Sequence, residues 1–262
     1  MNFIETHCHL DGEEFAADLN EVILRAKDAG CAQLLIPAIN QTGLQRIFQL
    51  CADNPGWAYP MLGLHPEEVN ANYTSQLTAM HTSLSALMQS AQPPVAIGEV
   101  GLDYYWSRDY YHEQQAAFEQ QVKWAAEYQL PLMIHCRKAQ VEMVKILRRY
   151  ENNLVGGIFH CFTGNEQEAT ELLSFRHFAL GIGGVLTFKK SKLPETLSAA
   201  VPLSRIVLET DSPYMAPVPM RGTRNEPSFI PYIINHLAEA YSTSPEHIAN
   251  QTTENARNIF SI

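Results

Sequence analysis

The sequence predicts an α/β protein with a TIM-type (β/α)8 barrel, formed as a single domain by residues 1–262. Short apolar segments alternate with amphipathic segments from one end of the chain to the other, which is the pattern of a barrel. The apolar segments are continuous runs, as expected for parallel strands that are covered on both faces. No Pro-, Gly- or Ser-rich linker, low-complexity tract or internal repeat divides the chain. A doubly wound open sheet is the main alternative.

Eight predicted strands are short, rich in Ile, Val, Leu, Phe or Met, and bounded by Gly, Pro or a polar turn. They are Phe3–His9, Gln33–Ile39, Tyr59–His65, Val95–Glu99, Leu130–Cys136, Val155–Cys161, Phe178–Gly183 and Arg205–Asp211. The predicted helices show apolar residues at helical spacing. They are Glu13–Gly30, Thr74–Gln89, Tyr110–Tyr128, Ala139–Tyr150, Glu166–Phe175, Lys192–Ala200, Ser228–Tyr241 and Pro245–Phe260. Gly30 suits the position just after a helix end.

Composition favours a cytoplasmic protein without a membrane partner. The chain begins without a basic and apolar leader, and no apolar run approaches the roughly 18–20 residues of a membrane helix. Five cysteines without a framework spacing fit a reducing compartment. The formal net charge of −10 argues against wrapping duplex DNA, since phosphate affinity comes largely from Lys and Arg. The oligomeric state stays open, and a monomer is compatible with the sequence.

Polar side chains close most of the predicted strands. In a barrel the carboxyl ends of the strands converge on one mouth, where active sites are found. The residues at these ends are His7, His9, His65, Glu99, His135, His160 and Asp211. Packing alone does not require imidazoles and carboxylates at such positions, so we interpret them as a metal-dependent active site.

The spacing indicates which of these residues act together. His7 and His9 share one face of their strand and can hold one cation. Glu99 closes an apolar strand, where a carboxylate is costly unless it is paired or coordinated, and its two oxygens can bridge two cations. His135 and His160 close two consecutive strands, and with Glu99 they form a set of two histidines and one carboxylate.

The remaining polar residues have candidate roles in the reaction. Asp211 can touch a metal and its bound water and accept a proton from that water. Alternation puts Glu209 on the same face, one layer deeper, where it can orient a ligand or hold water. His65 contacts a substrate phosphate or moves a proton, or else it is satisfied at a helix start. For Asp103, in a following loop, we favour a helix-capping or supporting role over metal binding.

Three cysteines flank proposed ligands. Strand alternation turns Cys8, Cys136 and Cys161 to the face opposite the ligands, beneath the helices. We therefore interpret them as buried small apolar side chains and not as ligands.

On these residues the sequence resembles the TatD family of metal-dependent deoxyribonucleases, within the amidohydrolase superfamily. The matching segments span nearly the whole chain: Glu5–Asp11, Gly63–Pro66, Ala96–Asp103, Pro131–Arg137, His160–Gly164, Leu208–Tyr214 and Arg224–Pro227. The resemblance implies two divalent cations. One is held by His7, His9, Glu99 and Asp211, and the other by Glu99, His135 and His160. The cations can be Zn, Mn, Mg, Fe or Co.

The resemblance also implies the reaction, which is hydrolysis of DNA phosphodiester bonds by a metal-activated water, as a 3′–5′ exonuclease on single-stranded ends. Asp211, Glu99, His65 and Glu209 are then the catalytic residues. Substrate would meet His65 and a basic rim that includes Arg137 and Arg224. The rim residues follow predicted strands five, seven and eight: Arg137, Lys138, Lys189, Lys190, Lys192, Arg221 and Arg224. Such a local rim on an acidic chain suits single-stranded ends.

Several interpretations remain open from the sequence. Tyr104, Tyr105, Trp106 and Tyr214 follow predicted strands and can either stack on bases or pack against neighbouring loops. The same metal site could serve an esterase, a lactonase or an aminoacyl deacylase, because a fold does not fix its substrate. A non-catalytic metal-binding scaffold is a further alternative, which the complete ligand set disfavours.

Overall fold

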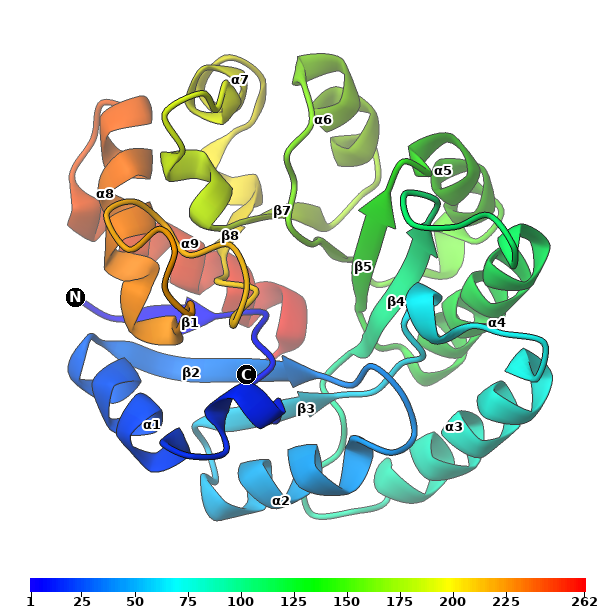
Figure 1. Ribbon diagram of the computed structural model, residues 1–262. Helices are drawn as coiled ribbons and strands as arrows, with labels where there is room; N and C mark the ends of the chain where they lie inside the picture. Colours follow the sequence, from blue (N-terminus) through cyan, green and yellow to red (C-terminus); the bar gives the residue numbers. More distant parts are fainter. The chain divides into compact units, whose positions relative to one another are not determined.

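The computed structural model describes all 262 residues, which form two compact units (Figure 1). Unit 1 contains Met1–Ile36, Cys161–Ser174 and Phe178–Ile262. Unit 2 contains Pro37–His160 and Phe175–His177. Each unit contains four strands, so all eight predicted strands are present. The last residue of one strand of unit 1, Pro37, is counted with unit 2.

Hydrogen bonds join the strands of unit 1. These strands are β1 (Phe3–Glu5), β2 (Cys31–Pro37), β7 (Phe178–Ile182) and β8 (Ile206–Leu208). β1 pairs in parallel with β2, and β7 pairs in parallel with β8. The Thr6 amide donates to the Leu208 carbonyl at 3.0 Å, which fixes β1 beside β8. The N-terminal and C-terminal parts of the chain are therefore neighbours in this unit.

Five α-helices accompany the strands of unit 1. They are α1 (Leu19–Asp28), α6 (Glu166–Leu173), α7 (Leu193–Ala200), α8 (Ile230–Ala240) and α9 (Pro245–Phe260). Two of their starts follow simple rules: Asn165 forms a capping box with Glu168, and Ser244 caps α9 through the His247 amide. Gly30 follows α1 with a φ of +103°, where a Cβ would lie 2.1 Å from the Met1 carbonyl oxygen. Only glycine fits there, as the sequence indicated.

Unit 2 is built from one continuous segment and three added residues. Its strands are β3 (Ala58–Met61), β4 (Ile97–Asp103), β5 (Leu132–Arg137) and β6 (Gly157–Phe159). β4 pairs in parallel with β5, β5 pairs in parallel with β6, and the Leu62 amide joins the end of β3 to the Ala96 carbonyl. Its helices are α2 (Leu44–Asp53), α3 (Tyr73–Leu87), α4 (Tyr111–Tyr128) and α5 (Gln140–Arg148).

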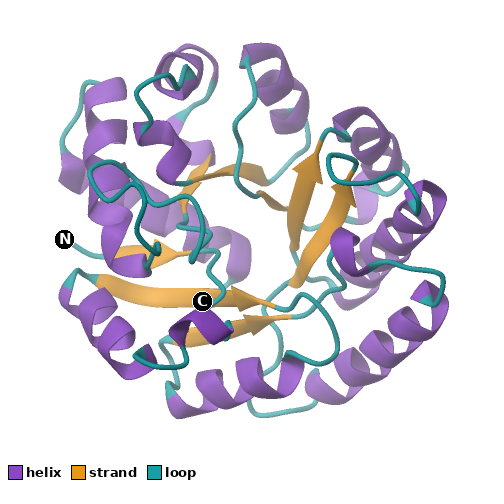
Figure 2. Ribbon diagram, in the orientation of Figure 1, coloured by secondary structure: helices purple, strands orange, loops and turns teal.

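In both units the α-helices lie along one side of the strands (Figure 2). None of the helices combines the length and the apolar character that crossing a membrane requires. The strands are almost wholly buried, as every residue of β4 and β7 illustrates. The continuous apolar runs in the sequence therefore predicted correctly that these strands are buried.

Several predicted boundaries were wrong. β1 ends at Glu5 and β8 at Leu208, so the polar residues that follow them belong to loops. β4 continues to Asp103, which we had assigned to a loop. The predicted helix Glu13–Gly30 is a short 3-10 turn, Glu13–Phe15, followed by α1. Helix α2 was missed, although its buried residues Leu44, Ile47, Leu50 and Cys51 recur at helical spacing.

Asn255 on α9 supports the start of β8. It is buried, and its side-chain amide donates to the carbonyls of Leu203 and Ile206, at 2.8 Å each. We expect Asn255→Ala to lower the free energy of unfolding by about 1–3 kcal/mol, because two buried carbonyls lose their donor. Urea unfolding measures this change. Gln251→Ala is the control, since Gln251 contacts only the side chain of Asn255 there; equal effects of the two substitutions would refute the assignment.

Candidate metal centre

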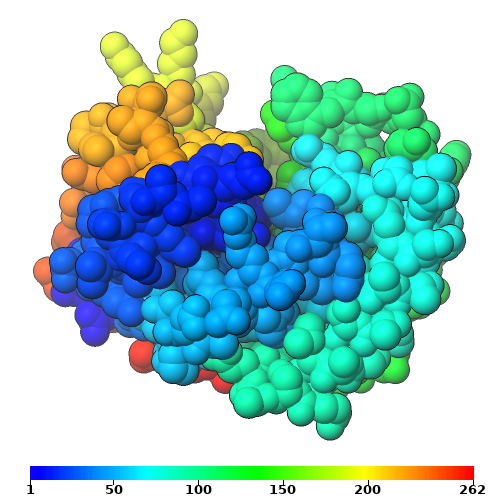
Figure 3. All heavy atoms as spheres, turned by 60° about the horizontal axis from the view of Figure 1, so that its bottom comes forward, coloured from blue at the N-terminus to red at the C-terminus, as the bar shows by residue number.

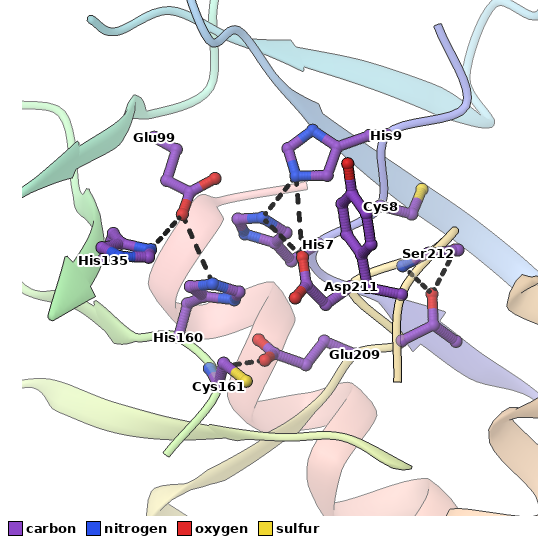
Figure 4. A network of polar contacts seen from close by, with 12 residues as sticks. His7, Cys8, His9, Glu99, His135, His160, Cys161, Glu209, Asp211 and Ser212 are labelled. Carbon is purple, nitrogen blue, oxygen red and sulfur yellow. Dashed lines mark hydrogen bonds and ion pairs between the residues drawn. The ribbon is translucent and has the colours of Figure 1, made fainter. Parts of the chain in front are cut away.

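In unit 1 the structure brings His7, His9 and Asp211 together (Figure 4). The Nε2 atoms of the two histidines are 3.2 Å apart. Asp211 Oδ1 lies 3.7 Å from His7 Nε2 and 3.6 Å from His9 Nε2. His7 is fully buried, His9 is 7 % exposed and Asp211 is partly exposed, so two buried imidazoles face a carboxylate that solvent can reach.

Backbone bonds hold these three side chains in register. The Asp211 amide donates to the His7 carbonyl, and the His9 amide donates to the Ser212 carbonyl, both at 2.9 Å. Asp211 has a φ of +55°, in the left-handed region that Asp tolerates better than most residues. Its side-chain direction therefore comes from this local backbone and not from strand alternation.

Glu5 is a supporting residue that the sequence analysis missed. Its carboxylate is fully buried, and Oε1 accepts hydrogen bonds from the amides of His7 and Thr210, both at 3.0 Å. One oxygen thereby fastens the segment that carries His7 to the segment that carries Asp211. Burial raises the pKa of Glu5 to about 8, against the lowering effect of these hydrogen bonds. Alternation two residues before His7 was the signal that could have revealed it.

Glu209 lies deeper than Asp211, as predicted from alternation. It is fully buried, and its Oε1 accepts a hydrogen bond from the Cys161 amide at 2.6 Å. A carboxylate oxygen of Glu209 is within 4.8 Å of a ring nitrogen of His7. Gly181 on β7 provides the room for this side chain, since a Cβ there would lie 2.1 Å from Glu209 Oε2.

The prediction for the cysteines is right for Cys8 and wrong for Cys161. Cys8 is fully buried, and its thiol contacts the Leu35 carbonyl. Cys161 is only partly buried, and its sulfur lies within 4.8 Å of an Asp211 carboxylate oxygen. A φ of +51° at Cys161 breaks the strand alternation on which the prediction relied. Cys136 is also only partly buried.

In unit 2 three histidines surround one oxygen of Glu99. Oε1 lies 3.3 Å from His65 Nε2, 2.9 Å from His135 Nδ1 and 3.4 Å from His160 Nε2 (Figure 4 shows the last two). Glu99 is 2 % exposed, so this carboxylate depends on the histidines to offset its burial. The four residues come from β4, β5 and the segments that follow β3 and β6.

Hydrogen bonds on the far side of each ring fix its orientation. His65 Nδ1 accepts the Glu67 amide at the start of a 3-10 turn (Pro66–Glu68), so Nε2 carries the proton that faces Glu99. His135 Nε2 donates to Asp103 Oδ2 at 2.9 Å. Burial lowers the pKa of His135, but Asp103 and Glu99 outweigh it and raise the pKa to about 9. Asp103 thus holds the ring of a histidine, and its supporting role in place of metal binding stays a prediction.

Both sets of donors have the spacing that a bound cation requires. Ligand atoms about 2.0–2.1 Å from a tetrahedral metal ion are about 3.3–3.4 Å apart. The separations within unit 1 are 3.2, 3.6 and 3.7 Å, and those around Glu99 Oε1 are 2.9, 3.3 and 3.4 Å. Imidazole with carboxylate is also the donor chemistry of divalent transition metals. The residues present therefore fit one divalent cation at His7, His9 and Asp211 and one at His65, Glu99 and His135.

The two arginines predicted to meet substrate have different surroundings. Arg137 is exposed, at the end of β5. The guanidinium of Arg224 instead holds the Asp18 carboxylate through two hydrogen bonds of 2.8 and 2.7 Å, and it stacks on Phe15. This ion pair is strong because the planar guanidinium donates two parallel hydrogen bonds to the two oxygens of the carboxylate. Its contact with substrate stays a prediction that requires this pair to open.

Apart from Arg224, the aromatic and basic residues of the predicted rim are exposed with one exception. Tyr104 is buried and stacks on Tyr111 at 4.5 Å, so it packs within the protein. The exposed residues are Tyr105, Trp106, Tyr214, Lys138, Lys189, Lys190, Lys192 and Arg221. Long side chains of the yellow-green part of the chain protrude from the surface in Figure 3.

Comparison with known proteins identifies relatives over the whole chain. The model of a family described as TatD related DNase matches residues 4–261. A metal-dependent hydrolase of Bacillus subtilis, YabD, is 37% identical over 258 residues and 98% of each chain. A 3′-5′ ssDNA/RNA exonuclease, TatD of Pantoea vagans, is 33% identical over 259 residues, which cover 96% of each chain.

A solved structure establishes the fold class. The TatD homologue YJJV of Escherichia coli K12 superposes with a TM-score of 0.89 and 29% identity, over 99% of this chain and 98% of that one. The fold class is therefore the (β/α)8 barrel that the sequence predicted, and the doubly wound alternative is excluded.

Gly181→Ala tests the position of Glu209. We expect it to reduce hydrolytic activity by about 10- to 100-fold, because the added methyl group displaces the Glu209 carboxylate from its contacts. Gly183→Ala is the matched control, since its Cβ meets nothing nearer than the Glu209 carbonyl oxygen at 3.4 Å. Steady-state rates, together with the bound-cation content, measure the effect. Similar losses in both variants would contradict the assignment.

Asp18→Asn tests the ion pair with Arg224. The hydrogen bond from Arg224 lowers the pKa of Asp18 to about 2, from its ordinary value of 3.8. The charged carboxylate therefore stabilises the folded protein above its ordinary pKa, and this contribution fades as the pH falls through 3.8 toward 2. We expect the melting temperature of the variant to lie below that of the wild type at pH 6, and the difference to shrink below pH 4. A difference independent of pH would contradict this account.

Proposed function

Since the chain belongs to the TatD-related DNase family and is a metal-dependent hydrolase, we propose that it is a 3′–5′ exonuclease acting on single-stranded DNA. The observation that carries this proposal is the pair of donor sets, one of His7, His9 and Asp211 and one of His65, Glu99 and His135, in each of which the ligand atoms lie within 4.8 Å of one another. The relative from Pantoea vagans, named for single-stranded DNA and RNA, supports the substrate.

Two divalent cations are part of the proposal. In this proposal His7, His9 and Asp211 would hold one cation, and Glu99 with His135 and His160 would hold the other. Mixed imidazole and carboxylate donors suit Zn, Mn, Fe or Co, and they suit Mg less well because Mg prefers oxygen ligands. When bound, such cations lower the pKa of a water molecule and offset the charge that builds up on the phosphate.

The protein's own side chains move the protons in this proposal. Asp211 is partly exposed, and its Oδ1 faces two histidines, so it can accept a proton from the attacking water. His65 carries its proton on Nε2 and can donate it to the leaving oxygen. The hydrogen bond from the Cys161 amide fixes the position of Glu209, so that its buried carboxylate lies close to the His7 ring.

Arg137 is our candidate for binding the substrate backbone. It is exposed at the end of β5, two residues after His135, and its guanidinium can hold a phosphate in bidentate fashion. The net charge of −10 favours a short single-stranded end over long duplex, because few positive charges are available to a second strand. The single-domain organisation of residues 1–262 and a cytoplasmic location remain predictions, and five free thiols favour the latter.

Glu99→Ala tests the proposal. We expect full-length protein, reloaded with Mn, Zn or Mg after chelation, to shorten a 5′-labelled single strand one nucleotide at a time. The variant should lose about 10²-fold or more of this activity, because Glu99 contacts three histidines of the site. Glu127→Ala, an exposed carboxylate on α4 of the same unit, is the matched control.

Two outcomes would overturn the proposal. Immediate release of the labelled 5′ nucleotide without intermediate lengths, or cuts scattered along the strand, would exclude a 3′–5′ exonuclease. Folded wild-type protein that leaves the strand intact with every cation would exclude DNA as substrate. Esters, lactones and aminoacyl compounds would then be tested on the same metal site.

A further inference from the structure

Two aromatic side chains directly after β4 face the solvent. Tyr105 is 51 % exposed and Trp106 is 68 % exposed, and their rings meet edge to face with centroids 4.8 Å apart. The other tryptophans, Trp57 and Trp124, are buried. Exposed aromatic rings in contact with each other cost solvation without adding to a core, so they mark a surface where something binds.

The conformation of this loop does not depend on the two exposed rings. Tyr104 anchors the loop, because it is buried and stacks on Tyr111. Asp103 Oδ1 accepts a hydrogen bond from the Tyr105 amide at 2.8 Å, so a side chain other than the two exposed rings fixes the turn. Packing therefore accounts for Tyr104 and leaves the side chains of Tyr105 and Trp106 unexplained.

Arg137 adds a cation to this surface. Its guanidinium carbon lies 3.8 Å from the centre of the Tyr105 ring and 5.3 Å from that of Trp106. Arg137 is the register partner of Asp103 across β4 and β5, so both loops start from the same level of the sheet. A guanidinium among aromatic rings is the arrangement on which bases stack while the cation meets the backbone.

A cavity of about 170 Å³ adjoins Trp106. Pro66, Val69 and Tyr110 supply apolar walls, while Glu67 and Asp103 supply carboxylates. The volume is smaller than the roughly 300–1,000 Å³ of typical ligand pockets, so it suits a single ring system. Carboxylates repel a phosphate, and they favour an uncharged ring that can donate hydrogen bonds.

We propose that Tyr105, Trp106 and Arg137 form a platform on which a base of the single strand stacks, close to the bond that is cut. Arg137 Cα is about 7 Å further along β5 than that of His135, at the usual rise of a strand. The platform therefore holds a nucleotide that neighbours the one at the metal centre. This inference rests on the proposed exonuclease function and adds the residues that position its substrate.

The first experiment compares two substrates in the metal-loaded, full-length enzyme. Trp106→Ala should lower kcat/KM for a single-stranded oligonucleotide by about 5- to 150-fold, the range of stacking on one aromatic ring. It should leave hydrolysis of an abasic strand of the same length unchanged, since that strand carries no ring to stack on the platform. Trp106→Phe, which keeps a ring, should recover most of the loss. Equal losses on both substrates, or no loss on the oligonucleotide, would overturn the platform.

The second experiment measures binding without turnover, so it separates the platform from the exonuclease proposal. Trp106 is the exposed tryptophan and reports through its fluorescence. Metal-loaded protein is titrated with a short oligothymidylate with phosphorothioate linkages, and with an abasic strand of equal length and charge. Quenching by the first strand alone, absent in Trp106→Phe, supports the platform even if the wild type cuts no DNA. Equal quenching by both strands, or none, would refute it.

Discussion

The buried carboxylate of Glu99 constrains the construction of unit 2. It is 2 % exposed, and one of its oxygens lies 2.9–3.4 Å from nitrogens of His65, His135 and His160. Removing a carboxylate from water costs several kcal/mol unless partners compensate. Three segments that follow or end parallel strands must therefore deliver an imidazole to the same point, and Asp103 and the Glu67 amide must hold two of those rings from behind. The ends of these strands therefore have to lie close enough together for the three rings to reach one oxygen.

Unit 1 also brings imidazoles and a carboxylate together, but its backbone positions them differently. Its donors stand on loop segments that backbone bonds and Glu5 tie together, and not on regular strands. A fully buried carboxylate behind a pair of histidines stiffens the site, since its movement would leave two backbone amides without an acceptor. The room left by Gly181 lets a second buried carboxylate, Glu209, approach from β8. In both units, therefore, buried carboxylates position the histidines or the backbone around them, whereas the carboxylate of Asp211 is partly exposed.

The sequence predicted the strands and most of the donors well, because both depend on short-range pattern. Continuous apolar runs identified all eight strands, and polar residues at their ends identified the residues that now meet in each unit. Alternation failed at Cys161 and could not give the direction of Asp211, since both have a left-handed backbone that no local pattern announces. Pairing at a distance was equally hidden: nothing near Arg224 in sequence shows that Asp18 holds it. The buried position of Tyr104, beside two exposed aromatic neighbours, depends on packing against α4 and not on composition.

The order of the chain in the two units has a consequence for how the protein is made. Unit 2 is nearly one continuous stretch, whereas unit 1 joins the first 36 residues to the last hundred. As translation proceeds from the N-terminus, Glu99 and its three histidines have all been synthesised by residue 160. The carboxylate that faces His7 and His9 is synthesised only later. His7 and His9 are made long before Asp211, which is the last of the proposed ligands to be synthesised. A nascent chain that ends before residue 211 therefore carries all of the proposed metal ligands except Asp211, so the donor set of unit 1 stays incomplete until most of the chain has been made.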